Sequence, residues 1–360
     1  MSIEQQISEL VSAEVRSLGA YKVPESTGLI KLDAMENPWE WSGDLETRWK
    51  EQLSGAQINR YPSADASSLK SAIRNLMGVG DDFDIILGNG SDEIIQLLVM
   101  LIAHTNRPIL SVEPSFVMYK MLSVWLNVDY VGVPLNQDFS MDVNAILNAI
   151  KDNDPAIIFI AQPNNPTGNL FDVDAIREIA KSTRGLVVVD EAYIAFSDSD
   201  SLHLLDEFSN VLLMRTLSKV GLAGLRLGIL IGSKQWLQEI NKIRLPYNIN
   251  VLTQISAEFA IENYQVFELQ TKRLRSNRES LLSQLETIPG VYVWPSSANF
   301  LLVRIVDKDV NSVHQFLKDQ GVLVKLLHGG HDLLVNCLRV NVSTEEENEQ
   351  LVAALKSALS

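Results

Sequence analysis

Residues 186–193 read LVVVDEAY, in which four apolar residues run without interruption into two carboxylates and a tyrosine. Such a Val/Leu run is typical of a strand buried on both faces, as in a parallel sheet covered by helices. The carboxylate of Asp190 is costly to bury unless it meets a cation, either a metal ion or a protonated heterocycle. An exposed strand-end acid that caps a helix is the plainer alternative. The segment therefore predicts a buried strand that can end at a ligand site.

Similar apolar runs recur through the first two thirds of the chain and alternate with helical patterns. Expected strands cover 84–87, 108–112, 129–133, 156–161, 186–189, 211–214 and 228–231. Helical patterns cover 93–104, 116–126, 143–151 and 173–181, and one long pattern runs over 252–285. Strand–helix alternation predicts an α/β fold with a mostly parallel seven-stranded sheet. We expect it to form a large domain at residues 33–265.

The pattern changes after Pro289. Strands are expected at 291–294, 300–305, 322–325 and 338–342, with helices at 310–319 and 345–359. This order predicts a smaller α+β domain at residues 266–360. Residues 1–32 are expected to form an arm, with a helix at 3–18, that packs with the smaller domain.

Composition narrows the class of protein. The net charge of −15 opposes binding to nucleic acid and to anionic membranes. No stretch approaches the roughly 18 uninterrupted apolar residues that a membrane helix needs. The single cysteine, Cys337, excludes a disulfide within the chain and is typical of a reducing compartment. These features predict a cytoplasmic protein with no nucleic-acid or membrane partner.

Three more polar segments follow predicted strands, where ligands of α/β sheets bind. Residues 88–93, GNGSDE, form a glycine-rich turn into a helix, which suits a phosphate, although an ordinary capped turn has the same composition. The segment lacks the third glycine of the dinucleotide fingerprint. Residues 162–168, QPNNPTG, form a stiff turn in which Asn165 can offer an amide N–H.

The last segment, 215–219, reads RTLSK and is followed by Arg226. Two hydroxyls and a guanidinium suit a phosphate dianion. Partial burial beside arginine would lower the pKa of Lys219 and make its amine a usable nucleophile. A solvated loop lysine is the plainer alternative.

In this order the four segments resemble the fold-type I pyridoxal-phosphate-dependent transferases, over nearly the whole chain. The strings KLDAMENP (31–38), RYP (60–62), PNNPTG (163–168), DEAY (190–193), RTLSK (215–219) and CLR (337–339) resemble the histidinol-phosphate aminotransferase family. The resemblance implies pyridoxal 5'-phosphate as the cofactor, no metal, and a homodimer that binds small-molecule substrates.

The resemblance also implies roles for individual residues. Lys219 would bind the cofactor as a Schiff base, Asp190 would keep the ring nitrogen protonated, and Tyr193 would contact the ring oxygen. The other expected cofactor-binding residues are Ser91, Asp92, Phe116, Asn165, Thr216, Ser218, Arg226 and, from the neighbouring subunit, Tyr61. The expected substrate-binding residues are Tyr21, Asn37, Lys325 and Arg339.

The implied reaction interconverts L-histidinol phosphate plus 2-oxoglutarate with imidazole-acetol phosphate plus L-glutamate, in histidine biosynthesis, by ping-pong kinetics. An aromatic-amino-acid aminotransferase, or another phospho-amine aminotransferase or decarboxylase of this fold, is the alternative.

The chain departs from common family patterns at Met35, at Lys325 and in its short Lys219–Arg226 spacing. A cofactor-binding transcription regulator would need a DNA-binding domain, for which the chain before Lys31 offers one helix.

Overall fold

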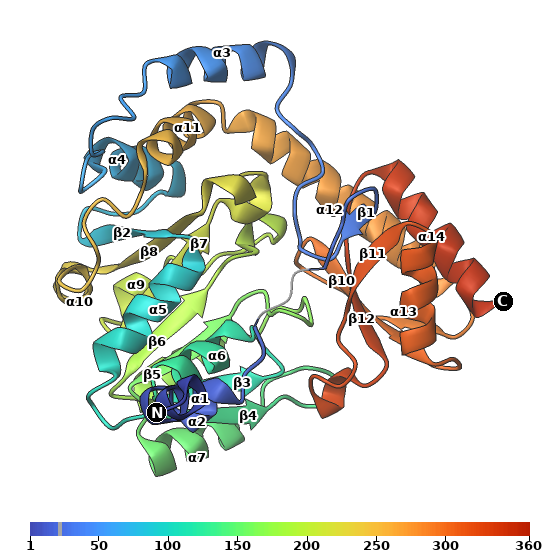
Figure 1. Cartoon of the computed structure of the whole chain (residues 1–360), viewed down its shortest axis with the longest axis horizontal. Helices are drawn as coiled ribbons and strands as arrows, with labels where there is room; N and C mark the ends of the chain where they lie inside the picture. Colours follow the sequence, from blue (N-terminus) through green and yellow to red (C-terminus); the bar gives the residue numbers. More distant parts are fainter. Residues whose placement is uncertain (21–23) are drawn as a thin grey trace.

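The computed structural model describes residues 1–20 and 24–360 of the chain. It contains a larger unit built on a seven-stranded sheet and a smaller unit built on a five-stranded sheet. Helix α12 (Gln265–Glu286) runs from the larger unit to the smaller one (Figure 1). Every helix among the described residues is too short or too polar to cross a membrane.

The large sheet has the strand order β2-β8-β7-β6-β5-β3-β4. Strand β8 pairs antiparallel with β2 and β7, and the remaining neighbours pair in parallel. The α/β class and the mostly parallel seven-stranded sheet are therefore confirmed. The strands are β2 (Phe83–Asn89), β3 (Ile109–Glu113), β4 (Tyr130–Pro134), β5 (Ile157–Ala161), β6 (Leu186–Asp190), β7 (Val211–Thr216) and β8 (Leu227–Ser233).

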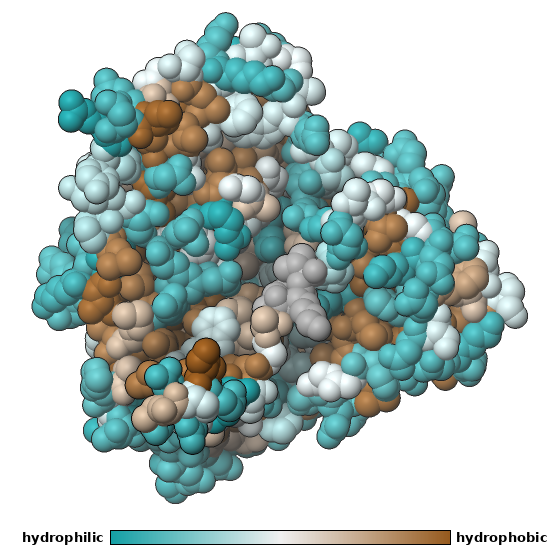
Figure 2. Space-filling model, in the orientation of Figure 1, coloured by the Kyte–Doolittle hydropathy of each residue, from teal (hydrophilic) through white to brown (hydrophobic). Residues whose placement is uncertain are grey.

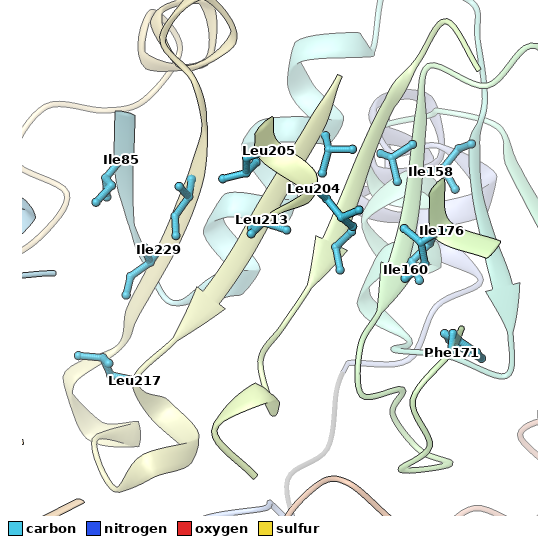
Figure 3. Close-up of a cluster of buried hydrophobic side chains, with 14 of the residues drawn as sticks. Ile85, Ile158, Ile160, Phe171, Ile176, Leu204, Leu205, Leu213, Leu217 and Ile229 are labelled. Carbon is cyan, nitrogen blue, oxygen red and sulfur yellow. The ribbon is translucent and has the colours of Figure 1, made fainter. Parts of the chain in front are cut away.

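Helices cover both faces of this sheet, which explains its uninterrupted apolar strands. Ile158 and Ile160 point to one face, where they belong to the same buried cluster as Ile176 and Leu204 (Figure 3). That face is covered by α4 (Ser67–Met77), α7 (Val143–Asn153), α8 (Val173–Ser182), α9 (Leu204–Glu207) and α11 (Val251–Glu262). The opposite face is covered by α5 (Ser91–Ile102), α6 (Met118–Trp125) and α10 (Lys234–Asn241). Helix α3 (Gly43–Ser54) packs outside α11.

The small sheet has the order β1-β11-β12-β10-β9, with β1 parallel to β11 and the other pairs antiparallel. Its elements form the expected α+β arrangement. The strands are β1 (Ile30–Leu32), β9 (Val291–Val293), β10 (Phe300–Ile305), β11 (Val322–Leu326) and β12 (Cys337–Asn341), and the helices are α13 (Val310–Asp319) and α14 (Glu345–Leu359). Short 3₁₀ turns are η1 (Ile194–Phe196), η2 (Ser218–Val220), η3 (Ala223–Leu225) and η4 (Asp332–Leu334).

The N-terminal arm differs from the expectation. Instead of one helix over 3–18 there are two, α1 (Ile3–Leu10) and α2 (Ala13–Arg16). The break occurs because the Ser12 hydroxyl accepts a hydrogen bond from the backbone N–H of Val15 and starts a new helix. Helix α2 contacts α6 of the larger unit, and β1 joins the small sheet. The packing of the helical part of the arm with the smaller unit stays a prediction. Apolar side chains of α1 remain exposed, as the space-filling view of these helices shows (Figure 2).

The long pattern over 252–285 also divides, into α11 and α12. The Asn263 side chain donates a hydrogen bond to the carbonyl of Phe259 and competes with continuation of the helix. Because α12 contacts elements around both sheets, the division of the chain into 33–265 and 266–360 stays a prediction.

Candidate active site

A cavity of about 240 Å³ lies where β5, β6 and β7 end. In parallel strands these carboxyl ends meet at one edge of the sheet, as the register of Ala161 with Asp190 and of Asp190 with Met214 shows. The cavity brings together most of the predicted cofactor-binding residues. They are Ser91, Asp92, Phe116, Asn165, Asp190, Tyr193, Thr216, Ser218, Lys219 and Arg226.

Asp190 is a buried carboxylate, with 4% of its surface exposed. One oxygen, Oδ2, accepts a hydrogen bond from the Tyr119 hydroxyl at 2.6 Å, and Oδ1 accepts one from the backbone N–H of Ala192 at 3.1 Å. Burial raises the pKa of Asp190 to about 6, although both hydrogen bonds oppose the rise. Among the described residues, no Lys, Arg or His forms an ion pair with it, and no group of three or more acidic, His or Cys residues is arranged to hold a metal ion.

Lys219 lies in η2, directly after β7, and its amine faces the same cavity. Its Nζ lies 5.7 Å from the centre of the Tyr193 ring and 3.5 Å from the carbonyl oxygen of Ala34. Burial, together with the positive charge of Arg339, lowers the pKa of Lys219 to about 8. The amine is therefore neutral more often near neutral pH than an exposed lysine is, and it can act as a nucleophile or a base.

Asn165 connects Tyr193 to Arg339. Its side-chain amide donates to the Tyr193 hydroxyl at 3.1 Å, and its carbonyl oxygen accepts from Nη1 of Arg339 at 2.6 Å. Nη2 of Arg339 donates to the backbone carbonyl of Asp33 at 2.9 Å. The guanidinium, which is buried, is thus held in one orientation by two elements that are far apart in the sequence.

The other end of the cavity suits a phosphate. Helix α5 begins at Ser91, which lines the cavity, so the positive end of the helix lies there. The side chain of no described residue makes a capping hydrogen bond to its first turn. The hydroxyls of Thr216 and Ser218, 2.9 Å apart, and the Arg226 guanidinium line the same end. Arg226 also pairs with Asp92 at 3.3 Å. A cation, hydroxyls and unsatisfied N–H groups together form a suitable set of donors for a phosphate dianion.

A second cavity, of about 430 Å³, adjoins the first and shares Met35, Phe116 and Asn165 with it. Lys325 and Arg339, both predicted to bind substrate, line this cavity from neighbouring strands. They are paired directly opposite each other in the register of β11 and β12. Both side chains are cations, so together they would suit an anionic group bound in this cavity.

Two predicted residues lie away from this cavity. The Tyr61 side chain is 81% exposed and stacks on Tyr247 at 4.6 Å, away from the cavity lining of its own chain. Asn37 lines a separate cavity, where its amide donates to the Val220 carbonyl and to Gln270. Tyr21 falls outside the described residues.

Two residues that shape the site were not predicted from the sequence. Tyr119 contacts Asp190 although 71 positions separate them, and no local pattern indicates this contact. A side-chain carbon at Gly228 would lie 2.6 Å from the backbone nitrogen of Ser91, so this glycine lets the start of α5 approach β8. A glycine at the start of an otherwise apolar strand is the signal that could have indicated the close approach.

The raised pKa of Asp190 makes a prediction about stability. The native state holds its proton up to about pH 6 and the unfolded chain only to about pH 4, so burial of this acid costs stability as pH rises through that window. Asp190→Asn should therefore stabilise the cofactor-free protein at pH 7, by on the order of 2 kcal/mol, and have little effect below pH 4. Urea unfolding at both pH values measures this difference.

Asp309→Asn serves as the control, because hydrogen bonds from Ser312 and Asn311 lower the pKa of Asp309 to about 2. Its effect at pH 7 should have the opposite sign. An Asp190→Asn protein that is destabilised equally at both pH values would contradict the electrostatic assignment.

Comparison with known proteins identifies the family. The family model described as aminotransferase class I and II matches residues 27–355. Histidinol-phosphate aminotransferase 2 of Nitrosococcus oceani is 44% identical over 98% of both chains, and histidinol-phosphate aminotransferase of Chromobacterium violaceum is 45% identical over 97% of this chain and 98% of its own. The solved structure of histidinol-phosphate aminotransferase from Sinorhizobium meliloti in complex with pyridoxal-5'-phosphate has the same fold, with a TM-score of 0.86 at 22% identity over 97% of each chain. The resemblance is confirmed: the chain belongs to the aminotransferase class I and II family, whose enzymes depend on pyridoxal 5'-phosphate.

Proposed function

We propose that this aminotransferase interconverts L-histidinol phosphate and 2-oxoglutarate with imidazole-acetol phosphate and L-glutamate, as a step of histidine biosynthesis in the cytoplasm. The near full-length identity to curated histidinol-phosphate aminotransferases supports this substrate. The placement of Lys325 and Arg339 on adjacent strands in the lining of the second cavity is the structural observation that supports it, because two neighbouring cations suit a phosphate or a carboxylate.

The first cavity fits pyridoxal 5'-phosphate. The start of α5, with Thr216, Ser218 and Arg226, would hold the phosphate. Asp190 would pair with the ring nitrogen and thereby gain the cation that the described chain does not provide. Asn165 and Tyr193 would contact the ring oxygen, and Phe116 would pack against the ring. When bound, the cofactor supplies an electron-withdrawing ring that stabilises negative charge on the substrate carbon bearing the amine.

The chain's own residues would position the substrate and move its proton. Arg339, fixed by Asn165 and Asp33, would bind the carboxylate of glutamate with its guanidinium. Lys325 would bind the phosphate of histidinol phosphate as a point charge. The neutral Lys219 Nζ, with its pKa lowered to about 8, would take the proton from the substrate carbon that bears the amine and pass it to the bound cofactor on the same side of the cavity.

We further propose a homodimer in which Tyr61 contacts the cofactor phosphate of the partner subunit. The side chain is exposed in its own chain, as are the apolar side chains of Ile58 and Leu245. Exposed apolar residues of this kind are typical of a subunit interface. Sedimentation of the purified protein at the mass of one chain would contradict the dimer.

The visible spectrum of the cofactor-loaded protein tests the reaction. A band of the lysine-bound cofactor should form with wild-type protein and should shift on addition of L-histidinol phosphate and, separately, of L-glutamate. Lys219→Ala should bind the cofactor without forming that band, because no other lysine lines the cavity among the described residues. A shift with phenylalanine and glutamate but not with histidinol phosphate would favour the aromatic-amino-acid alternative.

Lys325→Met tests the role of the second cavity. Loss of a charge-assisted contact should raise KM for histidinol phosphate by about 10- to 100-fold and leave KM for glutamate nearly unchanged. Lys325→Arg is the matched control and should retain most of the affinity, since it keeps the charge. Equal increases in KM for both substrates would place the phosphate elsewhere.

A further inference from the structure

One tyrosine contacts the central acid of the site and has been given no role so far. Tyr119, on α6, is fully buried, and its hydroxyl donates a 2.6 Å hydrogen bond to Oδ2 of Asp190. Tyr119 lies outside the polar segments at the strand ends and outside the segments that resemble the histidinol-phosphate aminotransferase family. A buried hydrogen bond to a carboxylate is stronger than a neutral one, and it changes how readily that carboxylate takes up a proton.

The surroundings of Tyr119 fix the position of its hydroxyl. Its ring stacks on Phe159 of β5, with centroids 4.6 Å apart and planes 6° from parallel. The Phe116 ring packs edge-on against it at 5.6 Å. With one face stacked on Phe159 and Phe116 packed edge-on, a turn of the hydroxyl to another acceptor would disturb α6 or β5.

The charges around Asp190 make this donor important. Burial has the largest effect against a negative charge at Asp190, and the carboxylates of Asp92 on α5 and of Glu191, directly after β6, disfavour it further. The donors that favour the carboxylate are Tyr119 and the backbone N–H of Ala192. Burial also raises the pKa of Tyr119 well above its usual value, so its hydroxyl remains protonated and acts as a donor.

We propose that Tyr119 is a positioning residue for the cofactor, whose hydroxyl makes Asp190 a weaker base so that the shared proton resides on the ring nitrogen rather than on the carboxylate. The inference rests on the proposed function in one respect, namely that the ring nitrogen of pyridoxal 5'-phosphate meets Asp190. Without the hydroxyl, the carboxylate becomes more basic, the proton moves toward it, and the ring withdraws electrons less strongly.

Tyr119→Phe tests this directly, since it removes the hydroxyl and keeps the stacked ring. The holoenzyme is prepared with pyridoxal 5'-phosphate labelled with ¹⁵N in the ring, and the nitrogen chemical shift is recorded by NMR. Wild-type protein should give the shift of a protonated ring nitrogen, and Tyr119→Phe should move it toward the unprotonated value. Tyr264→Phe is the matched control. It removes the hydroxyl of a partly buried tyrosine that does not line the first cavity, and it should leave the nitrogen chemical shift unchanged. An unchanged shift in Tyr119→Phe would overturn the proposal.

A double-mutant comparison separates this role from a structural one. In the wild-type background, Tyr119→Phe should lower the rate of the glutamate half-reaction about tenfold, the equivalent of about one pKa unit at Asp190. In an Asp190→Asn background, the same substitution should change the rate little, because there is no carboxylate to tune. Equal losses in both backgrounds would show that Tyr119 acts through packing alone. The nitrogen shift needs no substrate, so a failure with histidinol phosphate would affect the proposed function and not this inference.

Discussion

The buried carboxylate of Asp190 constrains the rest of the site. Only 4% of its surface is exposed, and it accepts two hydrogen bonds, from Tyr119 and Ala192. Among the described residues no cation forms an ion pair with it. Burial of such a group is unfavourable unless a cation reaches it. A protonated pyridine ring would satisfy that requirement. The start of α5 and the amine of Lys219 line the same cavity, where they would hold the phosphate and the aldehyde carbon of the cofactor.

The parallel sheet brings these groups together. Asp190 ends β6, and Asn165 and Lys219 follow the adjacent strands β5 and β7, so the three residues lie at one edge of the sheet. The smaller unit contributes Arg339 and Lys325 from β12 and β11 to the adjoining cavity. In a chain with a net charge of −15, four cations, Lys219, Arg226, Lys325 and Arg339, therefore line two connected cavities, where they would attract small anionic substrates.

Much of this arrangement follows from local sequence. The run before Asp190 predicts a buried strand, and the polar residues after 161, 189 and 214 predict ligand contacts at its edge. Contacts between distant segments have no such signal, which is why the hydrogen bond from Tyr119 to Asp190 and the pairing of β1 with β11 were missed. Asn37 was predicted to bind substrate. Its side chain instead donates hydrogen bonds to Val220 and Gln270, which are distant in the sequence, and it lines another cavity. Short helices such as α1 and α2 depend on a single capping serine, which a periodicity argument does not resolve.

We propose above all that Lys219 binds the cofactor covalently in the cavity that also contains Asp190. Borohydride reduction of the cofactor-loaded protein makes a lysine-bound cofactor permanent, and mass spectrometry of the digested protein identifies the modified residue. We expect the added mass on the peptide that contains Lys219 and no labelling of that peptide in Lys219→Ala. Labelling of a different lysine in the wild-type protein, or none at all under loaded conditions, would contradict the account.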